Sequence, residues 1–266
     1  MTNPTNATLT NFITPCLLVL LSFGLLSTAV AQDLPAEEVL GELEAAATAT
    51  IDSQFLLTGD IQDADGTSYA LEIDVQLITE EQLAYVYIIQ PDAIADNFII
   101  IDDDVVYNYQ YLTNQVIILS ANDPDALGGL LPSDANVGDD VTNAERDIDI
   151  RLDLNMLFEG WQPVMEGYTE TPEGSAYIVR FDNVAMQDDV IIDYVRAQIL
   201  DGSLDAQTWA PYQLEFFSVA DGIDVPEDDT SDPVATLIFT GFETNVGLNP
   251  DDLRYLPPDA ELIDER

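Results

Sequence analysis

The hydrophobic pattern is densest in residues 83–119, where runs of β-branched and aromatic residues are separated by short polar breaks. Four such runs, divided by turn-forming residues at hairpin intervals, predict four consecutive antiparallel strands. Several of them are apolar at both parities, whereas a sheet with one wet face alternates apolar and polar residues. These strands therefore need apolar cover on both of their faces.

The flanking pattern predicts further strands and one helix. Residues 51–61 and 69–77 alternate apolar and polar side chains with period two, as half-buried strands do. Before them, residues 35–47 carry an apolar stripe at helical spacing behind Pro35, with Glu37 and Glu38 in the first turn. Strand patterns resume at residues 176–181, 190–197, 212–219 and 234–244.

Two segments between these strands have a less regular pattern. Residues 122–145 are rich in Pro, Gly, Asp and Asn, and an apolar island at 127–131 suggests a flap that closes over something. Residues 148–161 fit a helix, with apolar side chains at helical spacing from Leu154 to Trp161, but their first half also fits period two. The helix is the favoured interpretation.

These segments add up to ten or eleven strands, few helices and no internal repeat. The predicted fold class is mainly β, with a single large curved antiparallel sheet and helices on its concave face.

The first 31 residues contain no charged side chain. An apolar run at 16–26 followed by Ala29-Val30-Ala31 is typical of a secretory signal peptide cleaved after Ala31. The alternative is an uncleaved anchor, although the run is short for a membrane span. The predicted organisation is a signal peptide at 1–31 and one domain at 32–266, which is exported and soluble after cleavage.

Charge and composition narrow the function. The 266 residues include 51 acidic side chains against six arginines and no lysine, for a net charge of -45. Nucleic acid and anionic membrane surfaces would be repelled, and such acidity is expected of a protein that works in concentrated salt. There is no histidine, and the single cysteine, Cys16, lies in the leader. Histidine-based triads and zinc sites with Cys or His ligands in the mature chain are therefore excluded.

The remaining motifs have simpler explanations than metal binding or catalysis. Asp63-Ala64-Asp65-Gly66 with Glu72 has part of a calcium-loop spacing, but its first ligand position holds Ile61, so a hairpin turn is preferred. Residues 102–104 are likewise interpreted as a hairpin turn. A pair of carboxylates for glycoside hydrolysis stays open, because 51 acids place some pair at a suitable separation by chance. No metal, cofactor or catalytic residue is predicted.

Four features in sequence order resemble the LolA-like superfamily of outer-membrane lipoprotein carriers and sorting proteins. They are an amphipathic helix after a signal peptide, Pro91 followed by the hairpin at 98–109, the segment 209–216 that begins Trp-Ala-Pro, and the closing segment 239–262 with its Pro257-Pro258 tail. The resemblance implies an unclosed β-barrel with a helical lid and an apolar interior that holds the acyl chains of a lipoprotein.

The function expected from the resemblance and from the apolar excess is a non-enzymatic carrier. It would be periplasmic or otherwise exported, monomeric, and would bind the acyl chains of a lipoprotein or lipid, with membrane-bound donor and acceptor proteins as partners. The candidate cavity residues are Phe55, Leu57, Leu71, Ile73, Val75, Tyr85, Tyr87, Phe98, Ile100, Leu127, Leu130, Leu154, Phe158 and Trp161. The alternative is a sensor or interaction module of the same fold without transport activity.

Overall fold

The computed structural model describes residues 34–62, 67–121, 150–184, 192–203, 208–218 and 232–266. The chain divides into two units, Met1–Leu34 and Pro35–Arg266, and all the described helices and strands belong to the second. The expected signal peptide, the flap island with Leu127 and Leu130, and the turn at residues 63–66 lie outside the described residues. They stay predictions.

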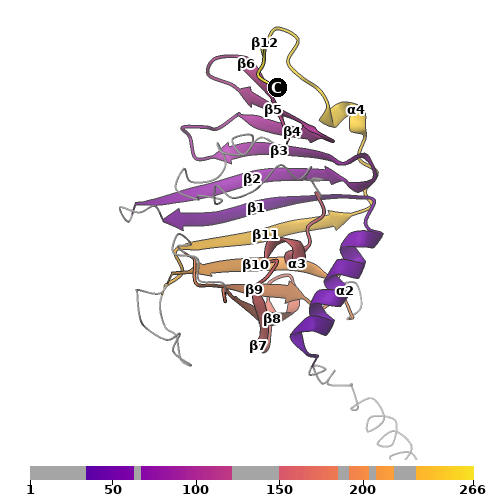
Figure 1. Ribbon diagram of the computed structural model, residues 1–266, viewed down its shortest axis with the longest axis vertical. Coiled ribbons are helices and arrows are strands. Elements are labelled where there is room, and N and C mark those ends of the chain that lie inside the picture. The colour runs from indigo at the N-terminus through magenta and orange to yellow at the C-terminus, as the bar shows by residue number, and fades with distance from the viewer. Residues whose placement is uncertain (1–33, 63–66, 122–149, 185–191, 204–207, 219–231) are drawn as a thin grey trace, which may run out of the picture. The chain divides into compact units, whose positions relative to one another are not determined.

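Twelve strands of the described chain pair side by side in one sheet (Figure 1). They are β1 (Asp52–Gln62), β2 (Ser68–Ile78), β3 (Leu83–Gln90), β4 (Phe98–Asp102), β5 (Val105–Gln110), β6 (Gln115–Ser120), β7 (Gln162–Thr171), β8 (Gly174–Asp182), β9 (Tyr194–Leu200), β10 (Ala210–Phe217), β11 (Ala235–Thr244) and β12 (Glu261–Asp264). Their spatial order is β12-β6-β5-β4-β3-β2-β1-β11-β10-β9-β8-β7, so the sheet ends at β12 and β7 and does not close on itself. The predicted fold class, a single large sheet forming an unclosed barrel with few helices, is confirmed.

Helices lie against both faces of the sheet. Helix α2 (Ala36–Ala49) and the short α3 (Leu154–Leu157) lie on one face, here called the α2 face, and α4 (Pro250–Leu253) lies on the opposite face (Figure 1). Pro35, predicted as the first helical residue, is the N-cap of α2, so the helix begins one residue later than predicted. Val39, Leu40 and Leu43 form its buried side. A single turn, η1 (Thr79–Glu81), joins β2 to β3.

The predicted helix over residues 148–161 is wrong for most of its length. Within its described part only Leu154–Leu157 is helical, started by Asp153, whose carboxylate accepts a bond from the backbone N–H of Asn155. Gly160 then adopts a positive φ of 83°, which ends the helical path, and β7 begins two residues later. Strand β7 was not predicted, because a bulge between Met165 and Gly167 interrupts its alternation.

Strand register explains why β3 to β6 are apolar at both parities. Paired residues share a face, and the pairs Tyr87–Phe98 and Phe98–Tyr109 lie on the face opposite α2. The pair Val86–Ile99 therefore lies on the α2 face. The two sets form separate buried clusters, so each parity packs into its own layer.

A C-terminal strap, residues 245–264, covers the opposite face of these strands. It leaves the end of β11, crosses the sheet and returns as β12, whose residues pair with β6 in parallel. The strap packs apolar side chains, led by Leu253 at 4% exposure, against the cluster that contains Phe98 and Ile100. The strap thus connects β11, in the interior of the sheet, to β12 at its edge, where the last strand runs in the same direction as β6. The parallel pair departs from the wholly antiparallel sheet predicted from the sequence.

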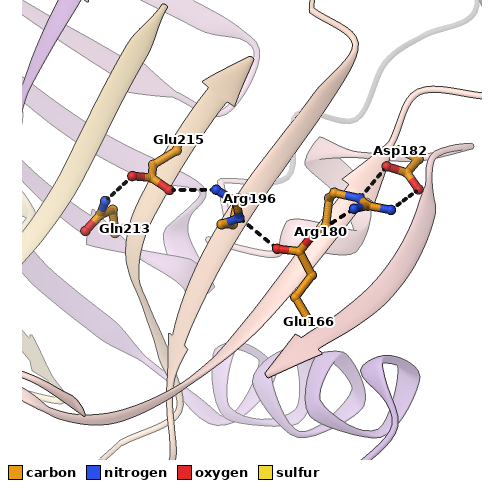
Figure 2. Close-up of polar contacts among 6 residues, drawn as sticks. All are labelled: Glu166, Arg180, Asp182, Arg196, Gln213 and Glu215. Carbon is orange, nitrogen blue, oxygen red and sulfur yellow. Dashed lines mark hydrogen bonds and ion pairs between the residues drawn. The ribbon is translucent and has the colours of Figure 1, made fainter. Parts of the chain in front are cut away.

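An ion-pair network ties the edge strand β7 to the sheet on the same opposite face (Figure 2). It consists of Glu166 (β7), Arg180 and Asp182 (β8), Arg196 (β9), and Gln213 and Glu215 (β10). Glu166 accepts from Arg180 at 2.8 Å and from Arg196 at 2.7 Å, so one carboxylate separates two arginines that are direct cross-strand neighbours. The hydrogen bonds that Arg180 donates to the carboxylate of Asp182 raise the pKa of Arg180. Each arginine has a carboxylate partner in this network, which therefore serves the sheet edge and offers no cation to an anionic ligand.

Candidate functional site

An apolar strip runs across the α2 face of the central strands β2, β1, β11 and β10. The register places in it Leu71, Ile73 and Val75 of β2, Phe55 and Leu57 of β1, Leu237 and Phe239 of β11, and Leu214 of β10. On the opposite face the same strands carry polar residues, including Glu72, Asp74 and Glu215. The central sheet thus has one apolar and one acidic face, and only the apolar face lies under a described helix.

Aromatic side chains form the middle of the strip. The ring of Phe55 lies 5.5 Å from that of Phe239 and 5.4 Å from that of Phe242, measured between centroids. The bulge in β11 at Gly241, with a φ of 61°, places both Phe239 and Phe242 on the face of Phe55. These large, closely spaced rings give the strip a continuous apolar floor.

Helices α2 and α3 lie over β7 to β10 and over one end of the strip (Figure 1). The apolar stripe of α2 is almost fully buried, with Val39 at 0% and Leu43 at 2% exposure. Leu154 of α3 is also fully buried. Phe158 directly follows the last residue of α3, and its ring centroid lies 4.7 Å from that of Phe181. The described helices leave the outer half of β1 and β2 uncovered (Figure 1).

A cleft opens where the C-terminal half of α2 meets the sheet. Its lining consists of Leu43, Ala47, Thr50, Ser53, Leu77, Thr79, Arg151, Leu152, Trp209, Pro211 and Phe242. The enclosed volume is about 20 Å³, which is room for about one water molecule. Ligand pockets usually hold about 300–1,000 Å³, so this cleft takes an acyl chain only if α2 moves away from the strip.

Among the described residues that line this cleft, Arg151 is the charged one. Its Nη1 donates a hydrogen bond to Oγ1 of Thr48 in the last turn of α2, at 3.2 Å. That turn contains no basic residue of its own, and the carbonyl end of a helix attracts positive charge. Arg151 therefore lies beside the C-terminal turn of α2, among described lining residues that are otherwise uncharged.

The structure divides the candidate residues predicted from the sequence into two groups. Phe55, Leu57, Leu71, Ile73 and Val75 lie together in the strip, and Leu154, Phe158 and Trp161 lie at its helical roof. Tyr85, Tyr87, Phe98 and Ile100 lie on the opposite face beneath the C-terminal strap. The second group cannot line the same cavity as the first, because the sheet itself separates them.

Several residues of the site were missed by the sequence analysis. Leu214, Phe239 and Phe242 come from strands far along the chain, and Trp209 directly precedes β10. The shared face of Phe239 and Phe242 could be assigned only with the β11 bulge known. Arg151 gave one usable signal, since it is one of only six basic residues in the chain. Its place beside α2 depends on a contact between residues 103 positions apart.

The described residues give no sign of a metal centre or a membrane-spanning helix. No group of three or more Cys, Asp or Glu side chains among them could hold a metal ion. Within the same part of the chain, no helix has the length and apolar character needed to cross a bilayer.

Comparison with known structures places the fold. The chain is similar to an uncharacterized conserved protein from Thermus thermophilus, with 18% identity, a TM-score of 0.55, and coverage of 86% of this chain and 98% of that one. It also matches a LolA superfamily protein from Nitrosomonas europaea (14% identity, TM-score 0.36, 84% and 98% covered). A third match is a putative outer membrane lipoprotein-sorting protein domain from Vibrio parahaemolyticus, with 12% identity, a TM-score of 0.36, and coverage of 82% of this chain and 95% of that one.

These likenesses concern the fold alone. No protein-family model and no curated protein sequence matches the chain.

Proposed function

We propose that this chain is an exported, non-enzymatic carrier that binds the acyl chains of a lipoprotein or lipid on the α2 face and passes them on. The observation that carries the proposal is the apolar strip, one end of which lies under α2, on one face of strands whose other face is acidic. A strip of this kind can bury acyl chains against apolar side chains and so remove them from water. The sequence resemblance to lipoprotein carriers supports the same function.

The energies of helix and ligand are of comparable size. Burying Val39, Leu40 and Leu43 contributes about 1.5–3 kcal/mol each, or roughly 5–9 kcal/mol that holds α2 on the sheet. An acyl chain of roughly fifteen methylenes gains about 12 kcal/mol when it leaves water, at ~0.8 kcal/mol per methylene. An acyl chain can therefore offset the displacement of α2, and the helix can expel the chain when an acceptor offers an equal site.

Substitution of two adjacent leucines of β1 provides a test of where the acyl chain binds. Leu57 is half-buried on the α2 face, and Leu56 is half-buried on the opposite face of the same strand. Leu57→Gln should weaken binding of a fluorescent fatty acid by about fivefold or more, since a polar group enters the apolar path. Leu56→Gln should bind it as the wild type does. Equal affinity of both variants, each shown to be folded by circular dichroism, would contradict the proposed site.

A second candidate function is a module of the same fold that binds a lipidated or protein partner without delivering it. The small enclosed volume of the α2 cleft favours this alternative, because no acyl-sized space is preformed there. A transfer assay separates the two functions. Protein loaded with a fluorescent acyl probe should release it to acceptor vesicles faster than the probe escapes spontaneously if the chain is a carrier, and should retain it if the chain is a binding module.

A further inference from the structure

A group of hydrogen bonds, here called the junction, joins the end of α2 to the start of the C-terminal strap. It consists of Ile51 and Asp52, which follow the C-cap of α2, and of Asn245, Val246 and Gly247, which follow β11. The Oδ1 of Asn245 accepts a bond from the backbone N–H of Ile51 at 2.9 Å. The backbone N–H of Asn245 donates to the carbonyl of Asp52 at 2.7 Å. The junction thus holds together segments that are 194 positions apart in the sequence.

The carboxylate of Asp52 lies at the centre of the junction. Asp52 is 5% exposed, and its oxygens accept bonds from the backbone N–H of Val246 at 2.7 Å and from that of Gly247 at 3.1 and 3.2 Å. Asn245 and Gly247 have positive φ angles of 56° and 80°, which Asn and Gly adopt more readily than other residues. A buried carboxylate that lost these donors would be left unpaired, so the junction is costly to open.

The packing of α2 itself is of a different kind. Val39, Leu40 and Leu43 form its buried side, and their contacts are apolar. An acyl chain that enters beneath the helix replaces these contacts with other apolar ones, but its methylenes offer no donor or acceptor in place of the bonds of the junction. Admission of a chain should therefore free the N-terminal part of α2 and leave its C-terminal end in place.

We propose that the junction makes residues 50–51 a fixed hinge on which α2 turns to admit an acyl ligand, and that Asp52 and Asn245 are positioning residues for this movement. The inference rests on the proposed function, since it describes how the ligand enters the same site. A turn about this hinge opens the space beneath α2 most widely at its N-terminal end, which lies toward β7 (Figure 1). The ligand therefore enters from the side of β7.

The length of the helix gives this movement a measurable size. One layer of carbon atoms needs about 4 Å of separation, and Leu43 lies about 9 Å from Ala49 along the helix axis. Raising Leu43 by that separation about the hinge requires a turn of roughly 25°. The turn moves Glu37, about 18 Å from Ala49, by about 8 Å and moves Ala49 by less than about 1 Å. A helix that lifted off the sheet without turning would instead move both ends by about 4 Å.

Distances between spin labels, measured with and without a long-chain fatty acid, test the hinge. The single cysteine of the chain is first removed by Cys16→Ser, so that only introduced cysteines carry labels. One label replaces Gln198, which lies on the face of β9 opposite α2, and the other replaces exposed Glu37 or exposed Ala49. In 1 M salt, which screens the repulsion between ligand and protein, loading should lengthen the distance from Glu37 by about 5–8 Å. The distance from Ala49 should stay unchanged.

Substitutions at two left-handed positions separate the junction from a general loss of stability. Asn245→Gly tolerates the positive φ but removes the acceptor for the N–H of Ile51, so loading should then move the label at Ala49 as well. Asn245→Asp keeps an acceptor and should restore the wild-type result. Asn114→Gly removes the side-chain bonds of an asparagine at the far end of the strap, which also has a positive φ, and should leave the label at Ala49 in place.

The outcomes also separate this inference from the proposed function. Equal movement at both labels, or no movement at either while equilibrium dialysis shows the fatty acid bound, would overturn the hinge and leave the carrier proposal standing. A label at Ala49 that stays in place in Asn245→Gly would overturn the positioning role of Asn245. If no fatty acid binds at any salt concentration, the proposed function itself fails, and the inference fails with it.

Discussion

Arg254 connects the C-terminal strap to the sheet across a large sequence distance, so its removal tests how the strap is held. Its Nε and Nη2 donate to the two carboxylate oxygens of Asp102, each at 2.9 Å, and its Nη1 lies 2.7 Å from the carboxylate of Glu81. These bonds raise the pKa of Arg254 well above its usual value. Asp102 ends β4, 152 positions away in the sequence. We predict that Arg254→Gln loosens the strap and lowers the free energy of unfolding.

The size of the effect follows from the exposure of the groups. The side chain of Arg254 is 35% exposed and that of Asp102 is 26% exposed, so water screens the pair and its loss costs far less than that of a buried pair. The two parallel hydrogen bonds to Asp102 and the second carboxylate, Glu81, make this contact stronger than an ordinary surface ion pair. The expected loss is about 1–2 kcal/mol. Removing the cation also leaves Asp102 and Glu81 near one another without the counter-charge that they share.

Arg266 provides a matched control, because it forms the same two-bond contact with Asp264, at 2.9 and 2.8 Å, only two residues away. Arg266→Gln removes the same charge but connects no distant segments, so it should leave urea unfolding unchanged. The loss for Arg254→Gln should shrink in 1 M salt, and backbone amides at residues 245–264 should exchange hydrogen faster than in the wild type. Identical unfolding curves for the two variants would refute the assignment of Arg254 as the fastening of the strap.

Two further predictions concern single positions. The hydrogen bond from Tyr87 to Asp96, 2.6 Å long, raises the pKa of Tyr87 to about 12; its stabilisation is complete below pH ~10 and is lost as pH rises through about 12. Ultraviolet titration should show one tyrosine that deprotonates near pH 12, and this transition should be absent from Tyr87→Phe. A transition that persists in the variant would contradict the assignment. Gly59→Ala should destabilise the fold, since its Cβ would collide with the backbone carbonyl oxygen of Thr236. Gly41→Ala in α2 has open space and should stabilise by about 0.5–1 kcal/mol; thermal melts showing the same sign for both would contradict this reasoning.

Periodicity located most of the strands, and the exceptions have physical causes. The predicted strand at 234–244 corresponds to β11 (Ala235–Thr244), and that at 176–181 to the core of β8 (Gly174–Asp182). β-Branched and aromatic side chains fit a pleated surface wherever it packs, so their runs are visible locally. Strand β7 was missed because its bulge changes the parity of the side chains, and β12 because four mostly exposed residues carry little pattern.

The candidate site was only half predictable for a related reason. Parity alone assigned Phe55, Leu57, Ile73 and Val75 to one face, and the structure agrees. The same reasoning could not tell which parity of β3 and β4 shares that face, because both parities there are apolar. Tyr85 and Phe98 were therefore grouped with the strip, although the register places them on the other side of the sheet.

The sequence by itself determined that this chain forms a large apolar-rich sheet and contains no histidine, and that residues 83–119 need cover on both faces. Only the tertiary structure decided where one cover comes from, namely the strap with Leu253 against the face of Phe98. It also brought Arg151 to the end of α2. The physical reason is that periodicity depends on neighbours a few residues apart, whereas these contacts join segments 100 or more residues apart, whose pairing depends on the folding of everything between them.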